Sequence, residues 1–215
     1  MNFGLDRLLS DAALRAPLKG RRVALLAHPA SVTRDLTHAV DALAACPEIT
    51  LSAAFGPQHG MKGDLQDNMM ESPDYSDPTH GIPVFSLYGE VRRPRDEWME
   101  TFDVILIDLQ DLGCRIYTYV TTLLYVLEAA AKHGKAVWVL DRPNPAGRPV
   151  EGMTLKTGYE SFVGAGPARM GGRRGGDARR SGCGDAARRG GMGRDAQAVL
   201  GVLIAWGRGR GRGGE

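Results

Sequence analysis

Five short apolar segments constrain the fold of this chain more than any other feature of its sequence. They span residues 22–27, 49–55, 83–88, 103–108 and 136–140. Between most of them, apolar residues recur every three or four positions, as on one face of an amphipathic helix. Short buried strands that alternate with such helices predict an α/β fold, a Rossmann-like parallel sheet with helices on both faces.

The helical patterns lie at residues 4–16, 33–44 and 115–133, with a shorter one after Pro94. We expect Thr33 to cap the second helix and Leu36 to begin its apolar face. Residues 56–82 interrupt the alternation, because they are rich in Gly, Asp, Asn, Met and Pro and show no clear helix. A loop of this length inside a compact domain is usually functional or disordered.

Composition excludes several classes of protein. The apolar fraction of 43% and the charged fraction of 24% are typical of a globular domain. The three cysteines lie far apart without metal or redox spacing, so we expect reduced thiols. There is no signal-peptide pattern at the start and no run of 18 apolar residues, so we expect no membrane segment. The expected location is the cytoplasm, or the periplasm if the true start lies upstream.

Polar residues follow all five apolar segments. Because the carboxyl ends of parallel strands share one edge of a sheet, and ligands bind at that edge, we expect these residues to form one site. They are His28 and Ser31, then Gln58 and His59, then Tyr88, then Asp108, Gln110 and Asp111, and finally Asp141, Arg142 and Asn144.

Several common chemistries have no motif here. The chain lacks the glycine patterns of dinucleotide and phosphate loops and the G-x-S-x-G serine elbow. Its histidines are not at metal-ligand spacing, so we expect neither a metal nor a cofactor.

The carboxylates remain, and paired carboxyl groups at the mouth of a cleft suit glycoside hydrolysis. Three follow strands, namely Asp108, Asp111 and Asp141, and three lie in the long loop, namely Asp64, Asp67 and Glu71. Asp108 and Asp141 equally suit helix capping or bonds to loop amides. His28 suits a structural histidine, whereas His59, between two glycines in a loop, is better explained by function.

Arginines and tyrosines could bind a sugar acid at the same edge. Arg115 and Arg142 could hold a substrate carboxylate, because guanidinium matches its geometry. For Arg142, holding the loop after the last strand is an equally good interpretation. Tyr88, Tyr117 and Tyr119 could stack on sugar rings, although a helical position for Tyr117 and Tyr119 would place at least one of them in the core.

The same residues resemble the signature blocks of a known family. The blocks are Gly56-Pro57-Gln58-His59-Gly60, residues 83–89, residues 108–113, Arg115-Ile116-Tyr117-Thr118-Tyr119, residues 141–145 and Glu151-Gly152. They are similar to blocks of the exo-acting β-N-acetylmuramidases of the NamZ type. The resemblance runs from about residue 4 to residue 167. It implies a Rossmann-like N-terminal domain at 1–167, a smaller second domain across a cleft, and release of N-acetylmuramic acid from the non-reducing ends of peptidoglycan fragments, as in cell-wall recycling.

One departure from that family concerns the catalytic acid. Many relatives read G-P-E-H-G, and that glutamate is the family's favoured acid, whereas this chain has Gln58. An amide cannot donate a proton as a carboxylic acid does. Either the activity is lost or another carboxyl group replaces it, and Glu71, in the Asp67–Ser72 run, is our candidate.

The second departure is the tail. Residues 168–215 hold 15 Gly and 11 Arg with only 4 acidic residues, and show no amphipathic period. We expect this segment to be disordered, and its abrupt start is typical of a frameshift in a GC-rich gene that removes the second domain. A genuine Arg-Gly tail that binds RNA electrostatically is the weaker alternative.

The sequence therefore predicts a glycosidase whose partner is a peptidoglycan-derived saccharide, with nucleic acid and membrane as unlikely partners. A non-catalytic sugar-binding protein, or an inactive truncated one, is the alternative that Gln58 favours. The expected catalytic residues are Glu71, His59, Asp111 and Asp141. The expected substrate-binding residues are Gln58, Asp108, Gln110, Arg115, Tyr117, Arg142 and Asn144.

Overall fold

The computed structural model describes residues 3–63, 71–112, 117–145, 159 and 161–163. Within these residues the chain forms one sheet of six strands, in the order β3-β4-β2-β1-β5-β6. All neighbouring strands are parallel except β3, which pairs antiparallel with β4. The strands are β1 (Arg22–Ala27), β2 (Thr50–Gly56), β3 (Tyr75–Ser76), β4 (Pro83–Ser86), β5 (Val104–Asp108) and β6 (Ala136–Val139). The predicted α/β class and parallel sheet are confirmed.

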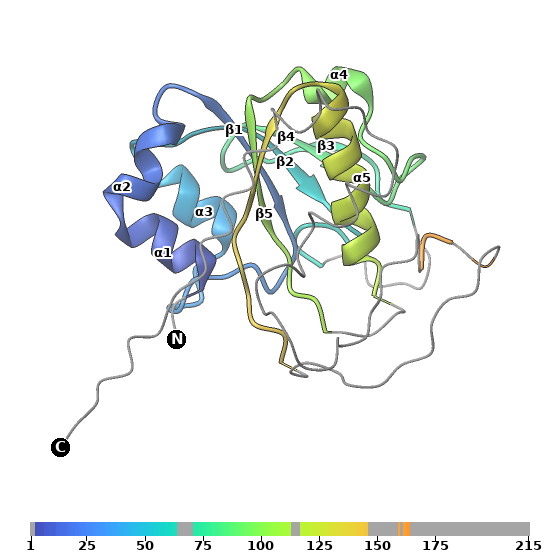
Figure 1. The fold of residues 1–215 in the computed structure, drawn as a ribbon, viewed down its shortest axis with the longest axis horizontal. Helices are drawn as coiled ribbons and strands as arrows, with labels where there is room; N and C mark the ends of the chain where they lie inside the picture. The colour runs from blue at the N-terminus through green and yellow to red at the C-terminus, as the bar shows by residue number, and fades with distance from the viewer. Residues whose placement is uncertain (1–2, 64–70, 113–116, 146–158, 160, 164–215) are drawn as a thin grey trace, which may run out of the picture.

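Helices cover both faces of this sheet (Figure 1). The bounds are α1 (Gly4–Ser10), α2 (Ala12–Arg15), the 3₁₀ helix η1 (Ala16–Leu18), α3 (Ala39–Ala44), α4 (Asp96–Met99) and α5 (Tyr119–Lys132). In β1, Val23 and Leu25 pack with α1 and α3, whereas Ala24 and Leu26 pack with α4 and α5. A strand buried on both faces must be apolar at every position, which explains the continuous apolar runs.

The first predicted helix is interrupted. Asp11 adopts an extended backbone (φ −116°, ψ 106°) between α1 and α2, and its side chain accepts a hydrogen bond from the backbone N–H of Ala13 at 2.9 Å. A short acidic side chain that bonds a nearby backbone N–H competes with the helical ladder. The apolar period of residues 4–16 therefore continues across the break, while the helix itself does not.

The predicted start of the second helix at Thr33 is wrong. Residues 31–38 form a tight loop in which Val32 and His38 make an antiparallel bridge, and α3 begins only at Ala39. Leu36 has a left-handed backbone (φ 62°) and is 80% exposed, so it contributes nothing to an apolar face. The cap is His38, whose ring nitrogen accepts from the backbone N–H of Val40 at 3.3 Å.

The longest helix also starts later than its apolar pattern suggests. It begins at Tyr119, after Thr118 in the cap position, so Tyr117 lies before the helix rather than on it. Residues 113–116, including Arg115, lie outside the described residues.

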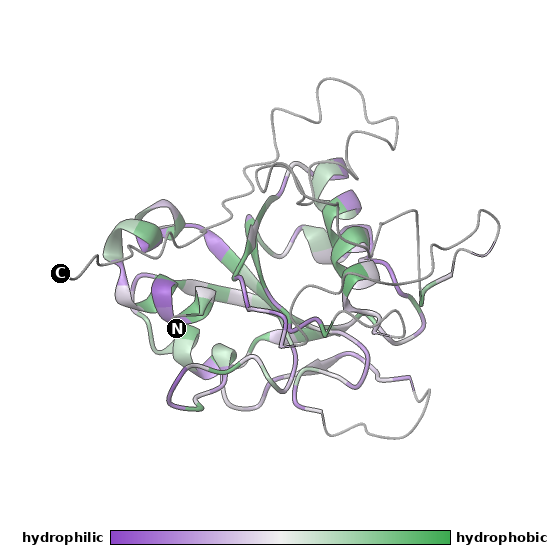
Figure 2. Ribbon diagram, turned by 60° about the horizontal axis from the view of Figure 1, so that its bottom comes forward, coloured by the Kyte–Doolittle hydropathy of each residue, from purple (hydrophilic) through white to green (hydrophobic). Residues whose placement is uncertain are grey.

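Hydrophobic residues concentrate on the strands and on the helix faces turned toward them (Figure 2). Within the described ranges, no helix has the length and apolar character needed to cross a bilayer. The boundary predicted at 167/168, the Gly/Arg-rich tail and Glu151-Gly152 all lie outside the described residues.

Candidate functional site at the carboxyl edge of the sheet

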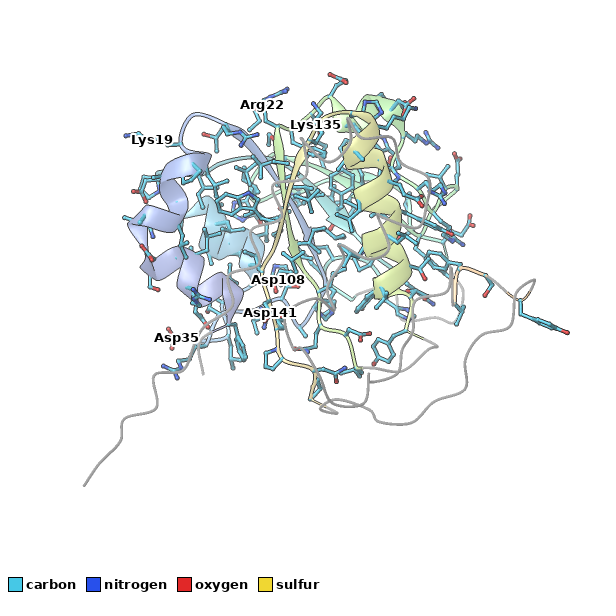
Figure 3. All side chains as sticks on the ribbon, in the orientation of Figure 1. Lys19, Arg22, Asp35, Asp108, Lys135 and Asp141 are labelled. Carbon is cyan, nitrogen blue, oxygen red and sulfur yellow. The ribbon has the colours of Figure 1, made fainter. Side chains whose placement is uncertain are left out.

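The carboxyl ends of β1, β2, β4, β5 and β6 share one edge of the sheet, as the parallel pairing requires. Figure 3 shows Asp108 and Asp141 at this edge, and Arg22 and Lys135 at the opposite one. The predicted gathering of strand-end residues therefore has a real geometric basis. The residues divide into two groups, one around β1, β5 and β6 and one around β2 and β4.

A buried ion pair dominates the first group. The Asp108 side chain is fully buried and the Arg142 side chain is 3% exposed. Nε of Arg142 donates to Oδ1 of Asp108, Nη2 donates to Oδ2 at 2.9 Å, and Nη2 also donates to the backbone oxygen of Val32 at 2.7 Å. Burial raises the pKa of Asp108, and the bonded guanidinium opposes that rise. A substrate carboxylate could reach Arg142 only by displacing Asp108, which favours a structural role for this arginine.

His28 and Gln110 complete this network. The His28 ring is buried, and its Nε2 accepts from the backbone N–H of Gln110 at 3.0 Å. Burial, together with the smaller effects of the Arg142 and His38 charges, lowers the pKa of His28 to about 4. The Gln110 side chain donates to the backbone oxygen of Pro143 at 2.8 Å. His28 is thus a neutral structural histidine, and Gln110 links the ends of β5 and β6.

The start of α5 connects the two groups. The Thr118 hydroxyl donates to Oε1 of Gln58 at 3.2 Å, which fixes the orientation of that amide. The Tyr119 ring meets the His28 ring edge-on at 4.9 Å between centroids, and the Tyr117 ring lies 5.8 Å from that of Tyr119. Burial, with a smaller effect from Tyr117, raises the pKa of Tyr119 to about 12. Both tyrosines are partly buried, so neither is a freely exposed stacking platform.

The turn after β2 has an unusual backbone. His59 has a φ of 71° and Gly60 a φ of 76°, both in the left-handed region. The Gly60 N–H donates to the Pro57 oxygen at 2.9 Å, and a Cβ on Gly56 would lie 2.9 Å from the backbone nitrogen of Met61. A non-glycine residue in this conformation costs about 1–2 kcal/mol. Such strain at a polar residue is an indication of function.

Glu71 lies at the carboxyl end of β4, next to that turn. The backbone N–H of Ser72 donates to the Tyr88 oxygen at 3.1 Å, and the N–H of Leu87 donates to the Gly56 oxygen at 2.8 Å. The Glu71 side chain is 58% exposed, and its Oε1 lies 3.5 Å from Nη2 of Arg92. The Arg92 guanidinium lies 3.8 Å from the centroid of the Tyr88 ring. Tyr88 is buried, so it supports Arg92 rather than offering an open face to a sugar.

The remaining predicted residues lie at the same edge of the sheet. Asp111 and Asn144 are partly buried, and Asp141 is exposed, with its backbone against Gly4 of α1. Asp64 and Asp67, like Arg115, lie outside the described residues. In the described part of the chain, no three His, Cys, Asp or Glu side chains gather closely enough to hold a metal ion.

Arg92 lies at this edge and is not among the residues predicted from the sequence. It stands beside Arg93 in a run of charged residues between β4 and α4, so nothing in the local sequence distinguishes it. Its position four residues after Tyr88 was the one feature of the sequence that could have indicated a contact with that ring.

Comparisons with known proteins identify the family. Residues 23–172 match the family model described as exo-β-N-acetylmuramidase NamZ, N-terminal. The chain is 44% identical over 165 residues to the peptidoglycan β-N-acetylmuramidase NamZ of Bacillus subtilis (strain 168), covering 76% of this chain and 39% of that protein.

Two crystal structures of DUF1343 family proteins from Bacteroides fragilis NCTC 9343 are also similar. One has a TM-score of 0.67 and 39% identity over 75% of this chain and 40% of the other. The second has a TM-score of 0.63 and 29% identity over 77% and 41%. The chain thus spans about 40% of the length of these relatives. With a family model matched across most of its sheet and a relative of 44% identity, the chain belongs to the NamZ family, of which it carries the N-terminal part.

Proposed function

We propose that this chain provides the N-terminal part of a glycoside hydrolase that acts on peptidoglycan and releases N-acetylmuramic acid from non-reducing ends. The observation that carries the proposal is the 44% identity over 165 residues to a peptidoglycan β-N-acetylmuramidase. The carboxyl-edge geometry supports it, because the strained turn and Glu71 lie on adjacent strand ends.

The β2/β4 group offers one of the two carboxyl groups that hydrolysis of a glycoside needs. One carboxyl group must protonate the leaving oxygen, and another must act as nucleophile or base. Glu71, exposed to solvent and paired with Arg92, is the candidate for the proton donor that Gln58 cannot be. Of the carboxyl groups predicted to be catalytic, Asp111 and Asp141 remain for the second role, and His59 lies in the turn after β2. Gln58, held by Thr118, presents an amide that can bond a sugar hydroxyl or acetamide.

Turnover of a chromogenic β-N-acetylmuramide tests the proposal. We expect Glu71→Gln to abolish turnover while the thermal unfolding curve stays unchanged, because Glu71 is exposed. Glu128→Gln is the matched control, since Glu128 is also an exposed glutamate paired with an arginine, on α5. Normal turnover by Glu71→Gln would exclude Glu71 as a catalytic residue.

A second candidate function is sugar binding without hydrolysis, which Gln58 favours. Binding of N-acetylmuramic acid with no turnover of the chromogenic substrate would support it. Gln58→Glu sharpens the distinction, because the Thr118 hydroxyl that now donates to the amide oxygen can donate equally to a carboxylate. If the missing carboxyl group is what limits this chain, Gln58→Glu gains turnover; if Glu71 already replaces it, the gain is small.

RNA binding through the Arg-Gly tail is the weakest candidate. Deleting residues 168–215 should leave sugar binding unchanged. Loss of a salt-dependent RNA complex on that deletion would support the tail as an RNA-binding segment.

A further inference from the structure

The Arg92–Glu71 pair places a cation beside the candidate catalytic carboxylate. Both side chains lie near the carboxyl end of β4, where the Ser72 N–H donates to the Tyr88 oxygen. Muramic acid carries a lactyl ether that ends in a carboxylate, so an enzyme that selects this sugar needs a cation within reach of the ring. Arg142, the described arginine that we expected to bind substrate, is occupied by buried Asp108.

Arg92 is already held in a fixed orientation. Its guanidinium lies over the Tyr88 ring at 3.8 Å, and its Nη1 donates to the Gly89 oxygen at 2.5 Å. The Phe162 ring also lies within 5.8 Å of the guanidinium. Stacking on an aromatic face leaves the N–H groups at the rim of a guanidinium directed outward, toward planar acceptors. The Arg92 side chain is 31% exposed, against 3% for Arg142, so a ligand from solvent can reach it.

The contact with Glu71 is weak enough to be exchanged. At 3.5 Å the Nη2–Oε1 distance is at the outer limit of a hydrogen bond, and the Glu71 side chain is 58% exposed. A bidentate carboxylate binds a guanidinium more strongly than one long contact does. An incoming carboxylate would therefore take the place of Glu71 on Arg92.

We propose that Arg92 binds the lactyl carboxylate of the muramic acid residue, and that this binding displaces Glu71 and frees it to face the sugar. The proposal rests on the proposed function. Binding of the lactyl carboxylate and release of Glu71 from Arg92 are then one event. A sugar without the carboxylate leaves Glu71 paired with Arg92.

A neighbouring arginine provides a matched control. The Arg93 guanidinium lies 3.7 Å from the centroid of the Tyr125 ring and pairs with Glu128. Arg93 thus has the same aromatic support and the same kind of acidic partner as Arg92, but its partners belong to α5 rather than to the strand end.

The test is the affinity of the full chain for three ligands, measured by NMR titration. These are N-acetylmuramic acid, its methyl ester and N-acetylglucosamine, which lacks the lactyl ether. We expect the unaltered chain to prefer the free acid. Arg92→Gln should reduce affinity for the acid roughly tenfold, to that of the ester, because a charge-assisted bidentate pair is lost. Arg93→Gln should change nothing.

Glu71→Gln gives the second readout. Removing the competitor should raise affinity for the acid by about twofold to fivefold, the range expected for an exposed ion pair, and leave the ester unaffected. Reduced affinity for the acid in this variant would overturn the displacement step. If the unaltered chain binds none of the three ligands, the proposed function fails, and this proposal with it. If the chain prefers the acid and Arg92→Gln keeps that preference, only this proposal fails.

Discussion

The two halves of the carboxyl edge differ in how completely their polar groups are used. Around β1, β5 and β6, Asp108 and Arg142 are buried and bonded to each other, and His28 is buried and neutral. Around β2 and β4, Glu71 is exposed, Arg92 is partly exposed, and one long contact joins them. The turn beside them holds His59 in a left-handed conformation. The first half behaves as scaffold. The second half has the solvent exposure and the backbone strain that are typical of a binding site.

This contrast separates residues that look equivalent in the sequence. Asp108 and Glu71 are both acids near strand ends, and Arg142 and Arg92 are both arginines that follow strands. Removing one partner of the buried Asp108–Arg142 pair should cost a large free energy of unfolding, because the other charge stays buried without a partner. The Glu71–Arg92 pair contributes little to the free energy of unfolding, so a ligand can take the place of one partner.

The largest expected effect is on the buried pair. We expect Asp108→Asn to lower the free energy of unfolding by about 3–5 kcal/mol, because Arg142 keeps its charge without its anion. Urea denaturation followed by circular dichroism measures this loss. Arg92→Gln is the matched comparison in the exposed half, and should cost less than about 1 kcal/mol. Equal losses in the two variants would remove the distinction between the halves.

The pH dependence of stability tests the same scaffold through His28. Its folded-state pKa of about 4 lies below the ordinary value of 6.5, so the unfolded state takes up a proton first as the pH falls. The free energy of unfolding should therefore decrease from pH 6.5 to pH 4, by about 3 kcal/mol in total.

His28→Gln keeps an acceptor for the Gln110 N–H and removes the titration, so its stability should change less over this interval. Asp103 loses its stabilising charge in a separate range, below its ordinary pKa, since hydrogen bonds from Arg22 lower its pKa to about 2. A pH profile from 6.5 to 4 that is unchanged by His28→Gln would contradict the assignment.

The strained turn predicts a smaller effect of opposite sign. His59→Gly removes a left-handed strain of about 1–2 kcal/mol, and the added chain entropy of glycine offsets about 0.5–1 kcal/mol of that gain. The free energy of unfolding should therefore rise by up to about 1.5 kcal/mol. Turnover or sugar binding should fall at the same time. Leu36→Gly is the control, because Leu36 also has a positive φ but lies in the exposed loop before α3. A similar gain in stability with unchanged sugar binding is expected there.

Strand-level features were predictable from the sequence because they depend on local apolar runs. The continuous runs of β1 and β5 required burial on both faces, and the structure provides it. Helix starts were less predictable, because Asp11 and the loop at 31–38 are set by side-chain bonds to the backbone that the apolar period does not register.

The location of the site at the strand ends was likewise predictable, because parallel strands bring their carboxyl ends together. The division of its residues between a buried network and an exposed pair was not predictable. Whether Arg142 faces a substrate or Asp108 depends on distances between strands that are distant in sequence. Arg92 acquires its importance only from Tyr88 beneath it and Glu71 beside it.

One measurement tests most directly the claim that the exposed half is the binding site. Backbone amide shifts of the full chain should be followed while N-acetylmuramic acid is added. We expect perturbations at Gly56 and Gln58–Gly60, at Glu71 and Ser72, and at Tyr88–Arg92, with little change at Asp108 or Arg142. Perturbations confined to His28, Asp108, Gln110 and Arg142 would contradict it.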